Sequence, residues 1–189
     1  MFLNNVLEVN RIFLPMFSFP GMTALDATAG NGYDTLQLSR LSGENGCVVA
    51  MDVQETALAN TKKLLDEKAE FDNIQLVLDS HVNAASYLYD KDLQLAVFNL
   101  GYLPGGDKNI TTNAGDVIKS LNGLFPVLQP GGAVFITVYP GHLPGQKEAG
   151  LLEDYFTCLP QKEFSVMKSL FVNQKNSPPQ FFIINKRST

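Results

Sequence analysis

The sequence has no tryptophan, only two cysteines and no long uninterrupted apolar run. Cys47 and Cys158 are far apart and stand in no metal-ligand spacing, so neither a disulfide framework nor a zinc site is expected. No apolar segment reaches the roughly 18 to 20 residues that cross a bilayer, and no secretory signal is recognisable at the start. These absences predict a chain with no membrane partner and no bound metal, in the cytoplasm.

Positive charge is also scarce: Lys and Arg number 14 against 19 Asp and Glu, which gives a formal net charge of -5. Non-specific nucleic-acid affinity comes mainly from neutralising phosphates, so this balance argues against a protein that coats nucleic acid and leaves only a local basic patch open. A length of 189 residues with 45% hydrophobic composition predicts one domain, 1–189, with an N-terminal helical segment at 1–20 and a core at 21–189.

Short β-rich runs alternate with helical stretches along the core, and this alternation predicts an α/β fold with a parallel sheet covered on both faces. We expect parallel strands at 23–26, 47–52, 74–78, 93–99 and 133–139, and a closing antiparallel hairpin at 164–172 and 180–185. Helices are expected at 34–41, 55–69, 112–128 and 147–158. A helix-to-strand turn is expected at Gly131 and Gly132. The prediction is a seven-stranded, mostly parallel, Rossmann-like sheet that binds its ligand at the carboxyl edge.

A glycine-flanked loop follows the first expected strand, in the string Asp-Ala-Thr-Ala-Gly-Asn-Gly at 26–32. Glycine allows positive φ and a close approach of the backbone, so Gly30 and Gly32 are expected beside a nucleoside and its amino-acid tail. A dinucleotide site usually has a third glycine three residues after the second, and here that position is Thr35. Binding of a pyrophosphate is therefore disfavoured.

An acidic residue, Asp52, ends the second expected strand 20 residues after Gly32, where a carboxylate can accept both ribose hydroxyls. Asp79, Ser80 and His81 end the third strand and are expected to flank an adenine. S-adenosylmethionine needs the ribose carboxylate and no phosphate cradle. The sequence thus predicts a class I S-adenosylmethionine-dependent methyltransferase, against the alternative of an ordinary turn, a helix cap and a solvated acid.

The loop after the fourth expected strand runs Asn-Leu-Gly-Tyr-Leu-Pro-Gly-Gly-Asp-Lys at 99–108. Its Asn-x-x-Tyr portion resembles the Asn-Pro-Pro-Tyr signature of methyltransferases that modify exocyclic amino groups. In those enzymes the Asn and a backbone carbonyl orient the target nitrogen, and the aromatic ring stacks on a base. Leu100 and Gly101 stand here where the signature has two prolines.

The combined motifs resemble one narrower family, the bacterial YtqB-type family. They are the strings at 26–35, 52–54, 80–81, 99–108, 139–142 and 173–179, and they span the chain from about residue 24 onward. The resemblance implies methylation of the amine of 5-aminomethyluridine, often 2-thiolated, at tRNA position 34, with the tRNA anticodon arm as partner and S-adenosylmethionine as cofactor.

The resemblance also implies roles for individual residues. Asn99, Tyr102 and His142 are the expected catalytic residues. The expected cofactor contacts are Asp26, Thr28, Gly30, Asn31, Gly32, Asp34, Thr35, Asp52, Gln54, Ser80, His81 and Asn99. The expected substrate contacts are Leu100, Gly101, Tyr102, Gly105, Lys108, Asn173 and Asn176. Arg11, Lys108 and Lys175 are candidates for anticodon phosphates.

Several alternatives stay open at this point. His81 and His142 each titrate near neutrality and can accept a proton, although a lone histidine is more often a surface or capping residue. The substrate can instead be rRNA or a small amine, and a catalytically silent RNA- or protein-binding module can keep the same fold. The sequence does not decide whether the protein is a homodimer.

Overall fold

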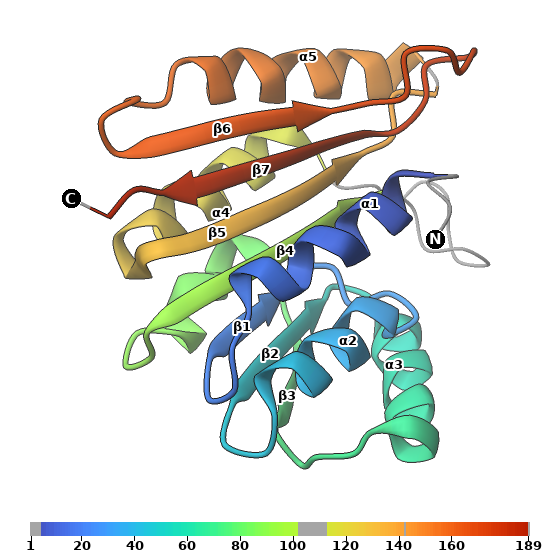
Figure 1. Cartoon of the computed structure of the whole chain (residues 1–189). Helices are drawn as coiled ribbons and strands as arrows, with labels where there is room; N and C mark the ends of the chain where they lie inside the picture. Colours follow the sequence, from blue (N-terminus) through green and yellow to red (C-terminus); the bar gives the residue numbers. More distant parts are fainter. Residues whose placement is uncertain (1–4, 102–112, 142, 189) are drawn as a thin grey trace.

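A computed structural model of the chain describes residues 5–101, 113–141 and 143–188. Within these residues seven strands form one sheet in the order β3-β2-β1-β4-β5-β7-β6 (Figure 1). Strands β1 to β5 are parallel, and β7 pairs antiparallel with both β5 and β6. Their bounds are β1 Thr23–Asp26, β2 Cys47–Asp52, β3 Ile74–Leu78, β4 Leu93–Leu100, β5 Leu128–Val138, β6 Phe164–Ser169 and β7 Gln180–Lys186.

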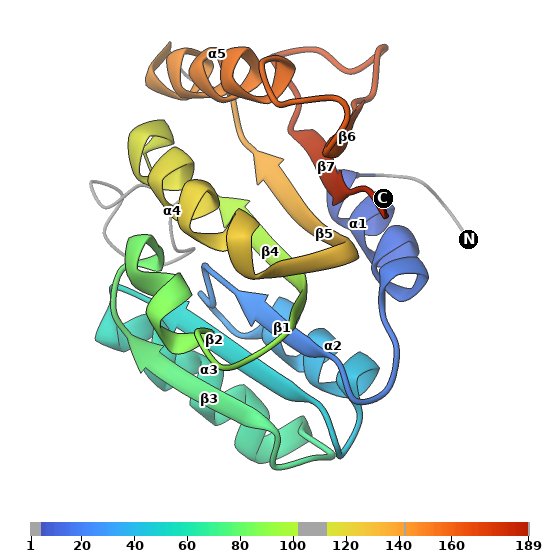
Figure 2. The ribbon, with the colours of Figure 1, turned by 90° about the vertical axis from the view of Figure 1, so that its left-hand side faces the viewer.

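Helices cover both faces of this sheet, as expected (Figure 2). One face carries α1 Val6–Phe13, the 3-10 turn η1 Leu14–Phe17, α2 Tyr33–Ser42 and α3 Glu55–Lys68; the other carries the 3-10 turn η2 His81–Tyr87, α4 Ala114–Val127 and α5 Leu143–Thr157. The sequence predicted α1 as part of the helical segment at 1–20. It predicted α2 and α3 to within a residue or two, and its helix at 112–128 contains the whole of α4. It did not predict η1 or η2.

Alternating side chains of the strands build a separate core on each face, because successive strand residues point to opposite sides. Under α1, Val6, Val9 and Leu14 pack against Phe135 and Phe181. Under α4 and α5, the central strands contribute a second cluster that contains Phe98, Phe156 and Phe182. All these side chains are nearly or fully buried, so the strand aromatics are core residues.

The start of β5 differs from the expectation. The strand begins at Leu128, so Gly131 and Gly132 lie within it, at a register irregularity between Leu93 and Leu95 of β4, rather than in a turn before it. Gly131 has φ +82, and a Cβ on Gly132 would lie 2.8 Å from the carbonyl oxygen of Gln94. Gly131 is needed for its positive φ and Gly132 because the backbone of β4 approaches it closely, which the pattern of turn residues could not reveal.

The remaining boundaries shift by a few residues. Strand β6 ends at Ser169, where 172 was expected, and α5 begins at Leu143, four residues earlier than expected. The antiparallel β7 starts at the carboxyl edge of β5, since Gln180 pairs with Val138. The loop before β7 therefore joins the loops after β1 to β5 at one edge. Among the described residues, no helix is both long and apolar enough to cross a bilayer.

Candidate active site

The loop between β1 and α2 is held in a shape that requires glycine. Gly30 and Gly32 have φ of +55 and +82, and the N–H of Gly32 donates to the carbonyl of Ala29 at 2.8 Å. A Cβ on Gly32 would lie 2.9 Å from the Cα of Thr61, while the Thr61 hydroxyl donates to the carbonyl of Gly30 at 3.1 Å. The loop thus packs directly on α3, and its fixed backbone is available to a ligand at the carboxyl edge.

Asp26, the last residue of β1, anchors this loop. Its carboxylate accepts hydrogen bonds from the Thr35 hydroxyl at 2.6 Å and from the N–H of Thr28 at 3.1 Å. Burial raises the pKa of Asp26 to about 7, and the nearby Asp34 carboxylate adds to this rise. The Thr28 hydroxyl in turn accepts the N–H of Asn99 at 2.8 Å. Asp26 therefore fixes the loop to α2, and Thr28 fixes it to the end of β4.

Asp52 lies at the end of β2 with its carboxylate turned to the same loop. It accepts the N–H of Gly30 and the N–H of Gln54, each at 3.0 Å. A carboxylate has about four acceptor positions, so two remain for the hydroxyls of a ribose. Asn31 accepts a hydrogen bond from Asn60 of α3 at 3.1 Å, which orients its side chain on the other side of the loop.

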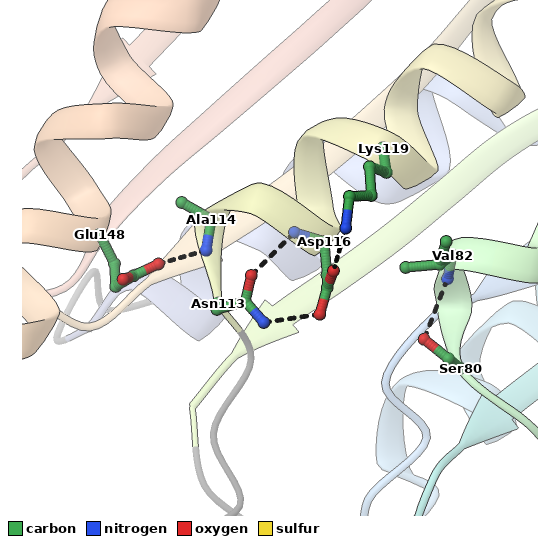
Figure 3. A network of polar contacts seen from close by, with 7 residues as sticks. All are labelled: Ser80, Val82, Asn113, Ala114, Asp116, Lys119 and Glu148. Atoms are coloured by element: carbon green, nitrogen blue, oxygen red, sulfur yellow. Dashed lines mark hydrogen bonds and ion pairs between the residues drawn. The ribbon is translucent and has the colours of Figure 1, made fainter.

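The residues after β3 form the start of η2. The Ser80 hydroxyl accepts the N–H of Val82 at 3.3 Å and caps this turn (Figure 3). Asp79 is used locally: its carboxylate accepts from Ser80 and Asn83, and from the hydroxyl of Tyr87 at 2.9 Å, and these bonds lower its pKa. This leaves Ser80 and the neighbouring His81 as the better placed of the expected adenine contacts.

His81 is only 8% exposed and packs edge-on against Phe98, with ring centroids 5.6 Å apart. Burial lowers the pKa of the imidazole, although the carboxylates of Asp116 and Asp52 act in the opposite direction. Its Nδ1 has no hydrogen-bond partner among the described residues. A buried neutral imidazole with a free polar atom favours a pocket role, in which a ligand supplies the missing partner.

Three polar side chains gather where β1, β4 and β5 end. Asn99 hydrogen-bonds with Asp34, which lowers the pKa of that carboxyl; burial, the largest effect, raises it, and Arg11 of α1 lowers it. Burial and the charge of Asp34 raise the pKa of Tyr139 to about 12, while a hydrogen bond with Asn99 opposes this. Each of Asp34, Asn99 and Tyr139 keeps part of its surface exposed, so together they offer a polar floor to a ligand.

Leu100 and Gly101, the expected substrate contacts that directly follow Asn99, can offer only backbone atoms to a ligand. The Leu100 side chain is buried in the core below α4 and α5, so only its backbone can face a ligand. The N–H of Gly101 donates to the carbonyl of Asn99 at 3.0 Å, and a Cβ there would lie 3.5 Å from the Tyr139 ring. Tyr102, Gly105, Lys108 and His142 lie outside the described residues.

The α4 and α5 side of the edge is fixed by caps. Asn113 accepts the N–H of Asp116 at 2.9 Å and donates to its carboxylate at 2.6 Å, and Glu148 of α5 accepts the N–H of Ala114 (Figure 3). Asn173 and Asn176 are exposed in the loop before β7. Asn176 has φ 62, a left-handed conformation that asparagine tolerates better than most residues.

The structure brings the expected loop, the ribose acid and Asn99 to one edge, and it adds residues that the sequence did not single out. Tyr139 was noted as a strand end and as the first residue of the 139–142 string, with no role of its own, although counting by twos from Phe135 puts it on the face of Asn99. Thr61 lies in the middle of a helix and gave no signal. Within the described ranges, no group of three His, Cys, Asp or Glu side chains is arranged to hold a metal.

A mostly parallel sheet with this loop after β1, an acid at the end of β2 that faces the loop and an amide near the end of β4 is the arrangement expected of S-adenosylmethionine-dependent methyltransferases. Comparison with known proteins agrees. Residues 48–185 match the family described as "Putative rRNA methylase", and the chain belongs to this family.

Three relatives cover almost the whole chain. The Arabidopsis thaliana "tRNA (mnm(5)s(2)U34)-methyltransferase, chloroplastic" is 32% identical over 96% of this chain and 69% of its own length. The crystal structure of a "putative rRNA-methylase" from Clostridium thermocellum is 37% identical, with a TM-score of 0.93. The match covers 98% of this chain and 100% of that chain. A Streptococcus mutans methyltransferase solved in complex with SAH is 34% identical, with a TM-score of 0.87, over 98% and 99%.

These relatives establish the enzyme class and its cofactor: the protein is an S-adenosylmethionine-dependent methyltransferase. The described residues fit that cofactor. The unused acceptor positions of Asp52 suit ribose hydroxyls. The backbone of the Gly30–Gly32 loop suits the amino-acid tail. The buried Nδ1 of His81 can hydrogen-bond with a polar atom of the cofactor.

Proposed function

We propose that this protein methylates the primary amine of 5-aminomethyl-(2-thio)uridine at wobble position 34 of tRNA, giving 5-methylaminomethyl-(2-thio)uridine. The observation that carries the proposal is the place of Asn99. Its backbone is tied to the cofactor loop through Thr28, and its side chain lies between Asp34 and Tyr139. The name of the Arabidopsis thaliana relative supports this substrate.

The proposed reaction asks little of the protein beyond binding and alignment. The bound cofactor supplies an activated methyl group on its sulfonium. In the proposal Asp52, Gln54, Asn31 and the glycine loop hold it, together with Ser80 and His81. Asn99 accepts a hydrogen bond from the target amine and directs the nitrogen lone pair at the methyl carbon, which converts two reactants into one aligned pair.

The proposed partner is the anticodon arm of a tRNA in the cytoplasm. Since the net charge is -5, the phosphates must be met locally, and Arg11 and Lys175 are the described cations we assign to them. The backbone of Leu100 and Gly101, with Asn173 and Asn176, would border the wobble nucleotide. Strand β6 is one of the two edges of the sheet and leaves Val166 and Met167 39% exposed; this is the edge where we would place the second copy of a homodimer.

Nucleoside mass spectrometry tests the proposal. Purified protein is incubated with S-adenosylmethionine and total tRNA from cells that lack this enzyme, and the same reaction is run with rRNA. We expect 5-aminomethyluridine species in tRNA to be converted to the methylaminomethyl form, with rRNA unchanged. Methyl transfer to rRNA alone would replace the proposal by the substrate in the family's description, and transfer to neither would leave a small amine as the substrate.

A further inference from the structure

Asp34 is an acid in a place where its charge is poorly compensated. It lies in the first turn of α2, and burial is the largest influence on its carboxyl. The groups that face it are Asp26 from β1, Arg11 from α1, Asn99 from β4 and Tyr139 from the end of β5. Burial raises the pKa of Asp34, and the Asn99 hydrogen bond and the Arg11 charge lower it, so a second acid stands beside Asp26 with one cation and one amide as partners.

A structural role does not account for this arrangement. An acid in a first helical turn commonly stabilises the helix through its exposed N–H groups. The hydrogen bond of Asp34 instead joins it to Asn99, which lies in β4 and not in its own helix. Asp34 also keeps part of its surface open, whereas Asp26 is fully buried with both oxygens engaged. The carboxyl of Asp34 is therefore the one that a ligand bound at Asn99 can reach.

The proposed reaction supplies a ligand that needs such a group. Alkyl ammonium groups resemble the lysine side chain, with a pKa near 10.4, so at neutral pH most of the substrate amine carries a proton. A protonated nitrogen has no lone pair and cannot attack a methyl group. The site must therefore both attract the cation and remove one proton before transfer.

Resting on the proposed function, we propose that Asp34 is the catalytic residue that binds the substrate ammonium beside Asn99 and takes its proton. The ammonium nitrogen gives one proton to the Asp34 carboxylate, leaving a neutral amine and a carboxylic acid. The amine lone pair then forms the new N–C bond as the C–S bond breaks, and that bonding pair stays on sulfur. The product leaves as a secondary ammonium, and Asp34 returns its proton to solvent.

Neighbouring groups are less suited to this step. Asp26 holds the loop, and Asp52 is engaged by Gly30 and Gln54 on the ribose side. Tyr139, with its pKa raised to about 12, stays protonated at neutral pH and can only donate a hydrogen bond. Burial raises the pKa of Asp34 and so makes it a better proton acceptor than an exposed carboxylate, while Asn99 and Arg11 act in the opposite direction and favour its charged form.

The test compares Asp34→Asn with wild type and with Asp66→Asn, which removes an exposed acid of α3 that pairs with Lys62. kcat/KM for tRNA bearing 5-aminomethyluridine is measured from pH 6 to 9, and SAH affinity is measured by calorimetry. At pH 7 we expect Asp34→Asn to lose roughly 100-fold or more and to regain about ten-fold per pH unit as the amine itself deprotonates. SAH affinity should stay within about two-fold, and Asp66→Asn should match wild type.

The outcomes separate the role of Asp34 from the proposed function. A loss in Asp34→Asn that is the same at every pH would refute proton acceptance, and a parallel loss of SAH affinity would assign Asp34 to the cofactor instead. Wild-type activity is the separate check on the proposed function: if wild type does not methylate this tRNA, that function fails and takes the inference with it. If wild type is active and only the pH-dependent recovery is missing, the inference alone fails.

Discussion

The buried carboxyl of Asp26 should make the protein less stable as the pH rises toward neutrality. Its pKa is about 7 in the folded chain against an ordinary value of 3.8. Between these values the folded protein keeps a proton that the unfolded chain has released, so stability present below pH 3.8 is lost as the pH rises to 7. At about 1.4 kcal/mol per pH unit, the full loss is about 4 kcal/mol.

Asp26→Asn is the perturbation that isolates this effect. The amide has the shape of the protonated acid and does not titrate, and the Thr35 hydroxyl can accept as well as donate a hydrogen bond. We expect the variant to equal wild type near pH 4 and to exceed its free energy of unfolding by roughly 3 to 4 kcal/mol at pH 7 to 8. Other acids, including Asp79 and Asp116, titrate in both proteins and cancel in the difference.

Urea unfolding followed by circular dichroism at several pH values between 4 and 8 measures both free energies. Asp66→Asn serves as a control, since it removes an exposed acid from α3 and should run parallel to wild type. If Asp26→Asn also runs parallel to wild type, Asp26 does not carry the proton and the argument from its burial is wrong.

Three further predictions concern the edge of the sheet. Gly32→Ala should lower the free energy of unfolding by about 3 kcal/mol, from positive φ and contact with the Thr61 backbone; urea unfolding checks this, and a loss under 1 kcal/mol would contradict it. Asn99→Ala should keep SAH affinity nearly unchanged while turnover falls on the order of 100-fold; equal losses in calorimetry and kinetics would refute its role. Asn113→Ala should cost about 1 kcal/mol through the lost cap of α4 at Asp116, and an unchanged thermal midpoint would argue against it.

The order of elements was predictable because each strand and helix carries its own hydrophobic period. The parallel core and the antiparallel hairpin are confirmed. That the ligand binds at the carboxyl edge stays a prediction. η2 escaped prediction because a short 3-10 turn has no periodic pattern long enough to read. It exists here because Asp79 gathers Ser80, Asn83 and Tyr87 around one carboxylate.

The site was predictable where residues follow strands directly, and less so where partners come from distant segments. Gly30 and Asp52 were singled out from their place after a strand and their spacing, and Asn99 from the resemblance of its loop to the Asn-Pro-Pro-Tyr signature. The roles expected of these residues remain predictions until tested. That Asp26 is a buried anchor, that Thr61 packs on Gly32 and that Tyr139 borders Asn99 depend on contacts between elements, and no local pattern encodes those contacts.

The packing of α1 against β7 has a consequence for synthesis. Val6, Val9 and Leu14 share one core with Phe181 and Ile183, yet about 170 residues separate them. At roughly 5 to 20 residues per second, the apolar side of α1 waits about 10 to 30 seconds for its partner strand to be made. Until β7 pairs with β5, the apolar side of α1 has only part of its core, the part that β4 and β5 supply, so the nascent chain exposes hydrophobic surface that a chaperone can bind.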